Sequence, residues 1–176
     1  MQRSTQPLAS SDLSSPVGRL TLVAEDVGLV AILWEDDDPL RVRLGTTQTD
    51  PTHAVLAETG RQLDAYFAGT RTMFDLPLAP RGTAFQQAVW RALLAIPFGE
   101  TRSYAQIARA ICRPTATRAV GAANGRNPIS IVAPCHRVVG SGGALTGFAG
   151  GLAAKRWLLD HERACGSNPE RLTLRP

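Results

Sequence analysis

The spacing of apolar and polar residues in the first half of the chain predicts a small unit of strands and one helix. Residues 20–24 and 29–34 form two apolar runs, and the acidic pair 25–26 lies between them. Apolar runs separated by turn-forming residues predict an antiparallel β-hairpin. Between residues 52 and 67 the apolar side chains recur with the spacing of one helix face, and Gly69 follows as a stop signal. We therefore expect a small antiparallel sheet with one amphipathic helix.

Three other segments of the first half carry weaker patterns. Residues 1–13 are polar and are predicted to form a loose leader. The acidic run at residues 35–39 is most simply interpreted as a solvated loop. Residues 72–82 contain a candidate further strand, followed by a linker.

Proline and glycine residues in the linker predict a domain boundary. Pro77, Pro80 and Gly82 follow one another closely, and such clusters interrupt both helices and strands. We therefore predict an N-terminal α/β domain over residues 1–80 and a C-terminal domain over residues 81–176.

The second half of the chain has stronger helix signals. Thr83 and Gln86 have the spacing of a capping box, and Ser103 and Gln106 repeat it. Four helices are predicted, over residues 83–96, 103–112, 115–125 and 151–164. The C-terminal domain is therefore expected to be mainly helical.

Two of these helices have the layout of a helix-turn-helix. A capped helix is followed by a tight break at Arg113-Pro114 and by a second helix. The second helix is slim, because Gly121 and several alanines surround a single long cation, Arg118. Two interpretations stay open at this point. The small residues permit close packing against another helix, or they permit entry into a DNA groove, with an arginine taking the place of a displaced base.

The charge is distributed unevenly between the two halves. The whole chain has a net charge of +4, but residues 1–80 hold 6 Arg and 11 acidic residues, a net of −5, whereas residues 81–176 hold 13 Lys or Arg and 4 acidic residues, a net of +9. A basic half favours a polyanion such as nucleic acid as partner. A solvated, arginine-rich surface explains the charge equally well.

Composition excludes several protein classes. The chain has 176 residues and no run of 18 apolar residues, so no membrane contact is expected. Its polar start does not resemble a secretory signal. Three cysteines without a C-x-x-C pair indicate reduced thiols and a cytoplasmic location. Residues 1–80 have no cysteine and only one histidine, too few ligands for a zinc site, and no metal or other cofactor is expected.

Cys135 stands in an unusual local context. Pro134 stiffens the main chain before it, and His136 beside it offers a base with a pKa near neutrality. Neighbouring side chains in an extended segment point to opposite faces, so a water would have to join the thiol to the imidazole. Asn127 precedes a proline and is suited to brace a turn, and Glu162 is the best acid to orient the histidine. On its own the pair leaves a hydrolase, a metal ligand and an inert core pair open.

Four stretches of the second half together resemble one protein family. They are "FQQAVW...IPFGETRSYAQIA", "RAVGAANGRNP", "NPISIVAPCHRVVGSGGALTGFAGG" and "KRWLLDHE". They resemble the O6-alkylguanine-DNA alkyltransferases, also called methylated-DNA–protein-cysteine methyltransferases, and the P-C-H-R-V motif among them is highly specific. The resemblance is close over residues 83–163 and loose over residues 14–80. It implies a ribonuclease-H-like N-terminal domain and a C-terminal domain with a helix-turn-helix.

The resemblance implies a catalytic role for five residues. Cys135 matches the alkyl acceptor, and His136 and Glu162 match a water-mediated relay that removes the thiol proton. Asn127 matches the residue that shapes the turn carrying the nucleophile, and Tyr104 matches the tyrosine that donates to the base.

The resemblance also implies binding residues. Arg118 matches the arginine that fills the stack vacated by a flipped base. The predicted DNA-binding residues are Arg118, Thr117, Ala119, Ala123 and Arg137. The predicted base pocket contains Val138, Phe148 and Ala149.

The implied activity is a DNA repair reaction that each molecule performs once. An alkyl group, typically methyl, moves irreversibly from O6 of a guanine flipped out of duplex DNA to Cys135, without a cofactor. The expected partner is double-stranded DNA containing O6-alkylguanine. The protein is expected to be a monomer, with cooperative assembly on DNA left open.

Two positions depart from the commoner pattern of the family. Phe148 stands where tyrosine is usual, which removes a hydroxyl near the base, and Thr117 stands where alanine is frequent. Cys112 and Cys165 match no functional position and are interpreted as bystanders.

Two other function classes have distinct signatures. A sensor of alkylated DNA would bind the lesion without chemistry, but relatives of that kind lack the cysteine that is present here. A cysteine hydrolase would turn over many times on an ester or a peptide and would need no basic helix-turn-helix.

Overall fold

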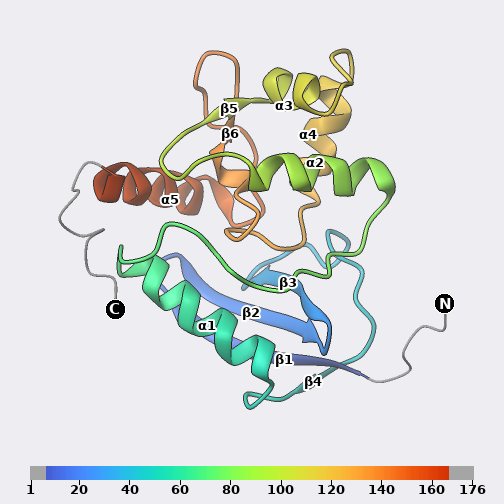
Figure 1. Cartoon of the computed structure of the whole chain (residues 1–176), viewed down its shortest axis with the longest axis vertical. Helices are drawn as coiled ribbons and strands as arrows, with labels where there is room; N and C mark the ends of the chain where they lie inside the picture. The colour runs from blue at the N-terminus through green and yellow to red at the C-terminus, as the bar shows by residue number, and fades with distance from the viewer. Residues whose placement is uncertain (1–6, 167–176) are drawn as a thin grey trace.

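The first half of the chain forms a four-stranded sheet covered by one helix. The computed structural model describes residues 7–166. The strands are β1 (Leu8–Ser15), β2 (Gly18–Glu25), β3 (Gly28–Trp34) and β4 (Thr47–Thr49), in the order β3-β2-β1-β4. Helix α1 (Ala54–Phe67) lies across the sheet (Figure 1). The expected hairpin and the expected helix are both confirmed.

The predicted polar leader is wrong over residues 8–13, which belong to strand β1. This strand pairs antiparallel with β2 along its length, from Ala9 opposite Ala24 to Ser15 opposite Gly18. Its serines hide the strand from a hydrophobicity pattern, because hydrogen bonds between backbones, rather than apolar side chains, hold most of it in place. Residues 1–6 of the predicted leader lie outside the described residues.

The sheet is mixed rather than antiparallel. Strand β2 pairs antiparallel with both β1 and β3, but β4 runs parallel to β1. A three-residue polar strand gives no pattern of its own, so its pairing and direction depend on tertiary contacts that periodicity does not report.

The candidate strand at residues 72–82 forms only a single bridge. Leu78 is paired with Leu29 on the outer edge of β3, where the Leu29 N–H donates to Pro77 O at 2.8 Å. Pro77 and Pro80 lack an N–H, so the segment cannot extend this ladder.

Residues 81–166 form four α-helices, as expected. They are α2 (Ala84–Leu94), α3 (Tyr104–Ala110), α4 (Thr117–Gly125) and α5 (Gly151–Gly166). Both predicted capping boxes are present, at Thr83 and at Ser103. Two short strands, β5 (Arg102–Ser103) and β6 (Val138–Val139), pair in parallel. Within residues 7–166, no helix combines the length and apolar character needed to cross a bilayer.

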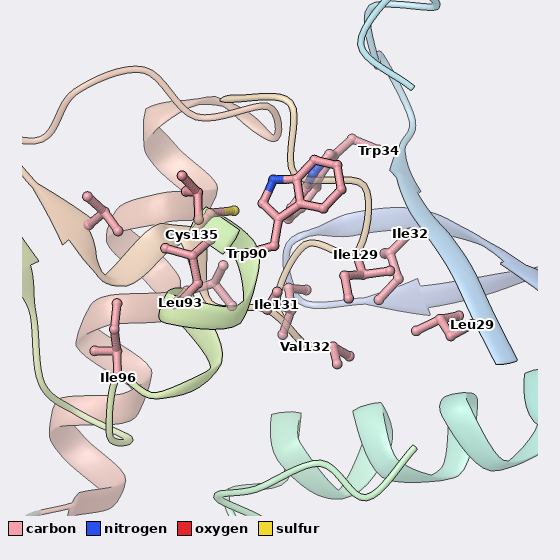
Figure 2. Close-up of a cluster of buried hydrophobic side chains, with 14 of the residues drawn as sticks. Leu29, Ile32, Trp34, Trp90, Leu93, Ile96, Ile129, Ile131, Val132 and Cys135 are labelled. Atoms are coloured by element: carbon pink, nitrogen blue, oxygen red, sulfur yellow. The ribbon is translucent and has the colours of Figure 1, made fainter. Parts of the chain in front are cut away.

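The two halves share one continuous hydrophobic core. Strand β3 is an edge strand of the sheet, and Ile32 on this strand is bridged to Ile129 of the second half, with the Ile32 N–H donating to Pro128 O at 2.8 Å. Figure 2 shows Ile129 and Val132 between the side chains of β3 and those of the C-terminal half. The segment that follows α4 is therefore attached to the sheet edge, and it leads directly to Cys135.

Candidate active site

The chain from Asn127 to Val139 is buried at every residue and contains the Cys-His pair. The Asn127 side chain braces this segment, as expected. Its amide Nδ2 donates to Ala133 O at 2.7 Å, and its Oδ1 accepts from the Ile129 N–H at 3.2 Å. Both contacts stay inside the segment, so the asparagine closes it into a compact loop before Pro134.

This loop contains a strained residue. Ile131 has φ 73° and is 1% exposed. The left-handed region is unfavourable for a β-branched side chain, so such a conformation persists only where the surroundings enforce it. Burial of the Ile131 side chain and the two Asn127 hydrogen bonds supply that constraint.

The thiol lies at the start of a 3₁₀ turn, Cys135–Arg137. The extended conformation predicted for this segment is therefore wrong. As predicted, however, Cys135 Sγ makes no direct hydrogen bond to the His136 ring among the described residues. Cys135 is 3% exposed. Burial raises the pKa of its thiol above the ordinary value of 9.0, while hydrogen bonding with Asn127 and the charge of Arg41 oppose part of that rise. The thiol therefore needs a base in order to react.

Five hydrogen bonds converge on the Glu162 carboxylate, which is fully buried in α5. His136 Nε2 donates to Oε1 at 2.8 Å, and the Tyr66 hydroxyl donates to the same oxygen at 2.8 Å. Arg137 donates twice, through Nε to Oε2 at 2.8 Å and through Nη2 to Oε1 at 2.9 Å. The N–H of Gly99 donates to Oε2 at 3.0 Å. A buried carboxylate with this many donors is held ionised.

The pKa shifts follow from this arrangement. Burial alone would raise the pKa of Glu162, but hydrogen bonds and charge from His136 and Arg137 outweigh it and hold that pKa well below its ordinary value of 4.5. Burial lowers the pKa of His136 below 6.5, although Glu162 opposes the change. The imidazole is therefore neutral at pH 7.

Ionised Glu162 fixes the tautomer of the neutral imidazole. Because Nε2 carries the proton that it donates to Glu162, Nδ1 is left as the acceptor. Nδ1 is buried and has no partner among the described residues. A buried acceptor without a partner, on the residue next to a buried thiol, is suited to receive the thiol proton through a water.

Helix α4 separates its residues between the core and the surface. Val120, Ala123 and Asn124 are buried, whereas Arg118 and Ala119 are exposed, and Thr117 at the start of the helix is partly buried. The Ala123 carbonyl accepts the Trp90 indole N–H at 2.9 Å. The close-packing interpretation is therefore confirmed for one face of the slim helix, while the other face is exposed and its entry into a DNA groove stays a prediction.

A second group of contacts lies in the loop between β6 and α5. The hydroxyls of Tyr104 and Thr146 are 2.7 Å apart. Lys155 is fully buried, and its ammonium donates to Val138 O at 2.6 Å and to Thr146 O at 3.1 Å. The half-buried Phe148 ring stands edge-on to His136, with ring centroids 6.4 Å apart.

Comparisons with known proteins agree with this arrangement. Residues 11–80 match the family model for the ribonuclease-like domain of 6-O-methylguanine DNA methyltransferase, and residues 84–164 match its DNA binding domain. The methylated-DNA–protein-cysteine methyltransferase of Mycolicibacterium paratuberculosis is 50% identical over 162 residues, which cover 92% of this chain and 95% of that protein. The chain belongs to the 6-O-methylguanine DNA methyltransferase family.

Solved structures of this family have the same architecture. Mycobacterium tuberculosis OGT, crystallised in complex with DNA, is 46% identical and has a TM-score of 0.83, over 89% of this chain and 94% of that one. The O6-methylguanine-DNA methyltransferase of Pyrococcus kodakaraensis is 22% identical and has a TM-score of 0.56, over 88% and 98% of the two chains, which shows a shared fold. The expected ribonuclease-like N-terminal half and helical DNA-binding C-terminal half of a methyltransferase are thus confirmed.

Two of the predicted DNA contacts of the methyltransferase need correction. Arg137 is 6% exposed and is paired with the buried Glu162, so its side chain does not lie on the surface where DNA contact was predicted. Ala123 is 3% exposed and packs inward on the buried face of α4. Sequence spacing alone did not distinguish these two buried residues from Arg118 and Ala119, which are exposed.

Sequence reasoning missed the contribution of the N-terminal half to the methyltransferase site. Tyr66 of α1 reaches Glu162, and Arg41 donates to the carbonyls of Ile32 and Asn127. Asp37 pairs with Arg41, and its side chain is 9% exposed. The prediction of a solvated loop at residues 35–39 is therefore wrong for Asp37. The i, i+4 spacing of Asp37 and Arg41 was the one local signal for this pair.

No metal centre is apparent in the described part of the methyltransferase. Residues 7–166 contain no group of three or more His, Cys, Asp or Glu side chains that could hold a metal ion.

Proposed function

We propose that this protein repairs O6-alkylguanine in duplex DNA by accepting the alkyl group on Cys135, once per molecule. Methyl is the alkyl group named for its family and its curated relatives. The observation that carries the assignment to these residues is the buried Glu162–His136 pair, because it leaves Nδ1, which has no partner within residues 7–166, as a base on the residue next to Cys135.

DNA engagement is assigned to the exposed face of α4. Arg118 and Ala119 lie on this face, and the family model for residues 84–164 is a DNA binding domain. Ala119 permits a close approach to a groove, while the Arg118 guanidinium replaces the flipped guanine in the base stack. Flipping costs a few kcal/mol, and the inserted arginine offsets part of this cost.

The flipped base enters between Tyr104 and the loop that carries Phe148 and Ala149, next to Val138. The Tyr104 hydroxyl then exchanges its hydrogen bond with Thr146 for one with the base. The Phe148 ring, edge-on to His136, forms one wall of the pocket. Tyr104, Phe148 and Ala149 are half-buried, and a base bound among them displaces water from these side chains, which strengthens the hydrogen bonds made to the base.

The alkyl transfer is a displacement at carbon. The Cys135 proton passes through a water to His136 Nδ1, and ionised Glu162 stabilises the imidazolium. The thiolate attacks the alkyl carbon, the S–C bond forms, and the C–O6 bond breaks. Tyr104 donates a hydrogen bond to the leaving guanine anion, which takes up one proton from water, while His136 releases to water the proton that came from Cys135; the net transfer is one proton from the thiol to guanine. The thioether has no good leaving group, so Cys135 does not return to its free form.

Stoichiometry tests this function. Duplex DNA with labelled O6-methylguanine is offered in tenfold excess, and we expect one methyl per protein molecule and no further turnover. Cys135→Ser should abolish transfer, whereas Cys112→Ser, which removes an exposed cysteine, should transfer as the unaltered protein does. Repeated turnover, or transfer that survives Cys135→Ser, would refute the proposal. Lesion binding without transfer would instead favour a sensor. A monomeric state and a cytoplasmic location stay predictions.

A further inference from the structure

Trp34 is the last residue of β3, and its side chain points from the N-terminal sheet toward the loop that precedes Cys135. It is 7% exposed and belongs to the shared core. Figure 2 shows Ile32 and Trp34 directed from β3 toward the segment that carries Ile129, which continues to Cys135. In that region Trp34 contacts Ser130 and Phe148.

The first partner of Trp34 is the loop that carries the nucleophile. The indole Nε1–H donates to Ser130 Oγ at 3.3 Å, and Ser130 is fully buried. Hydrogen bonding with Ser130 lowers the pKa of Cys135, against the larger effect of burial. Because Trp34 occupies a lone pair of the Ser130 hydroxyl, it fixes the direction in which the remaining O–H can point.

The second partner is the wall of the base pocket. The ring of Phe148 meets Trp34 edge-on, with centroids 5.3 Å apart and the planes at 69°, and its other neighbour is the His136 ring. The backbone at Gly150 lies directly on the indole, since a Cβ there would come within 2.5 Å of it. Phe148 therefore contacts both the Trp34 ring and the His136 ring, and the indole also lies against the backbone of the loop that carries Phe148.

We propose that Trp34 is a positioning residue that limits the size of the alkyl group the site accepts. The inference rests on the proposed function. The indole packs edge-on against Phe148, which in turn stands edge-on to His136, while the indole N–H holds the Ser130 hydroxyl. A small alkyl group fits this arrangement without displacement of the wall. A large group requires Phe148 to retreat, and Trp34 opposes that movement.

The consequence is a predicted change in preference rather than a simple loss of activity. A smaller residue at position 34 opens space behind Phe148, so the ring can move aside for a benzyl group. The same space loosens the wall around a methyl group. Loss of the aromatic pair and its packing therefore changes the ratio of benzyl to methyl transfer by about tenfold in favour of benzyl.

Three variants of the full chain test this inference. Trp34→Leu removes the ring, Trp34→Phe keeps a smaller ring without the N–H, and Trp157→Leu is the matched control. Trp157 also packs across the two halves, with its ring 5.9 Å from Phe67, but it makes no ring contact with Phe148. Single-turnover rate constants are measured for duplexes carrying O6-methylguanine and O6-benzylguanine, and their ratio is compared.

We expect the benzyl-to-methyl ratio to rise about tenfold in Trp34→Leu and about threefold in Trp34→Phe, and to stay unchanged in Trp157→Leu. If Trp34→Leu does not fold, the ratio in Trp34→Phe decides. Equal slowing of both reactions, with an unchanged ratio, would overturn the inference, because a purely structural role predicts that result. Methyl uptake by the unaltered protein is measured in parallel, so failure of the proposed function is recognised separately.

Discussion

Glu162 is the residue on which the catalytic arrangement depends. Its two oxygens accept from His136 and Arg137 of the 3₁₀ turn, from Tyr66 of α1 and from the Gly99 backbone, which belong to three different parts of the chain. Gly99 has φ 76°, a conformation that glycine adopts without strain and that presents its N–H to the carboxylate. Because Arg137 already neutralises Glu162, the carboxylate orients the imidazole and is not itself a proton acceptor.

Replacing the Glu162 carboxylate by an amide should damage both stability and chemistry. Glu162→Gln keeps the shape but leaves Arg137 as a buried charge without its counter-ion, which costs about 3–5 kcal/mol of unfolding free energy. The amide also no longer fixes the tautomer of His136. We expect urea denaturation to show this loss and single-turnover methyl transfer to slow at least tenfold.

The surface Glu58→Gln variant is the control for this measurement. Glu58 also pairs with an arginine, Arg61, but in solvent. We expect a change below about 1 kcal/mol there, because exposed pairs contribute little. An unfolding free energy of Glu162→Gln close to that of the control would contradict the assigned role.

At the scale of elements, the segment that joins α4 to the 3₁₀ turn is held by its own side chains. Asn127 satisfies a carbonyl at one end of the loop and an N–H in its middle, and Ile131 is kept in a left-handed conformation between them. The loop is also bridged to the edge of the sheet at Ile32. The position of Cys135 is therefore set by the loop and by β3 together.

Removing the Asn127 side chain should destabilise the loop over residues 127–133. Asn127→Ala leaves the buried Ile129 N–H without its partner, while the Ala133 carbonyl keeps only the Cys135 N–H, which donates to it at 2.8 Å. We expect a cost of about 1–3 kcal/mol. Asn124→Ala is a matched control, since Asn124 is equally buried but its amide oxygen has no partner among the described residues. We expect thermal unfolding to show the larger loss for Asn127→Ala. Equal losses in the two variants would contradict the bracing role.

The exposed face of α4 makes a separate prediction. Arg118→Ala should slow transfer from duplex DNA about tenfold to a hundredfold, since the vacated stack is no longer filled. Transfer from free O6-benzylguanine involves no flipping, so its rate should stay unchanged in the same variant. A parallel loss with both substrates would show that Arg118 acts on the fold or on the chemistry.

The elements also show how far sequence reasoning reached. The hairpin, the helices and their capping boxes were predictable, because each depends on residues close together in the chain. Strand β1 was not, since its serines carry no apolar pattern. The contacts of Tyr66, Arg41 and Trp34 with the site were not predictable either, because each joins residues that are far apart in the sequence. The family resemblance supplied the roles of Cys135 and Glu162, but no such pattern marked the N-terminal contacts.

At the scale of the whole molecule, the two halves form one functional unit. The acidic N-terminal half supplies positioning side chains to the site, while the basic C-terminal half supplies the nucleophile and the exposed face of α4. The shared core through β3 joins them. Loosening of the N-terminal half is therefore expected to reduce transfer even where the relay itself is intact.

The buried titratable groups predict how stability depends on pH. The pKa of His136 is lowered from 6.5 by burial, so its contribution is present above pH 6.5 and is lost as the pH falls below that value. The pKa of Cys135 is raised above 9.0 by burial, so its contribution is present below pH 9.0 and is lost as the pH rises through the raised value. We expect the greatest free energy of unfolding between these limits.

Urea denaturation across this range checks the prediction. Cys135→Ala should reduce the loss of stability above pH 9, whereas Cys112→Ser should retain it, because Cys112 is exposed. A profile that is unchanged above pH 9 in Cys135→Ala would contradict the assigned burial of the thiol.

The most direct test of the central claim is to locate the methyl group after a single turnover. The protein is incubated with a duplex containing one O6-methylguanine, digested, and analysed by peptide mass spectrometry, beside the Glu162→Gln and His136→Ala variants. We predict one methyl group on the peptide that contains Cys135, none on the peptides of Cys112 and Cys165, and slowed uptake in both variants. A methyl group on another residue, or uptake at Cys135 that is independent of His136 and Glu162, would contradict the account.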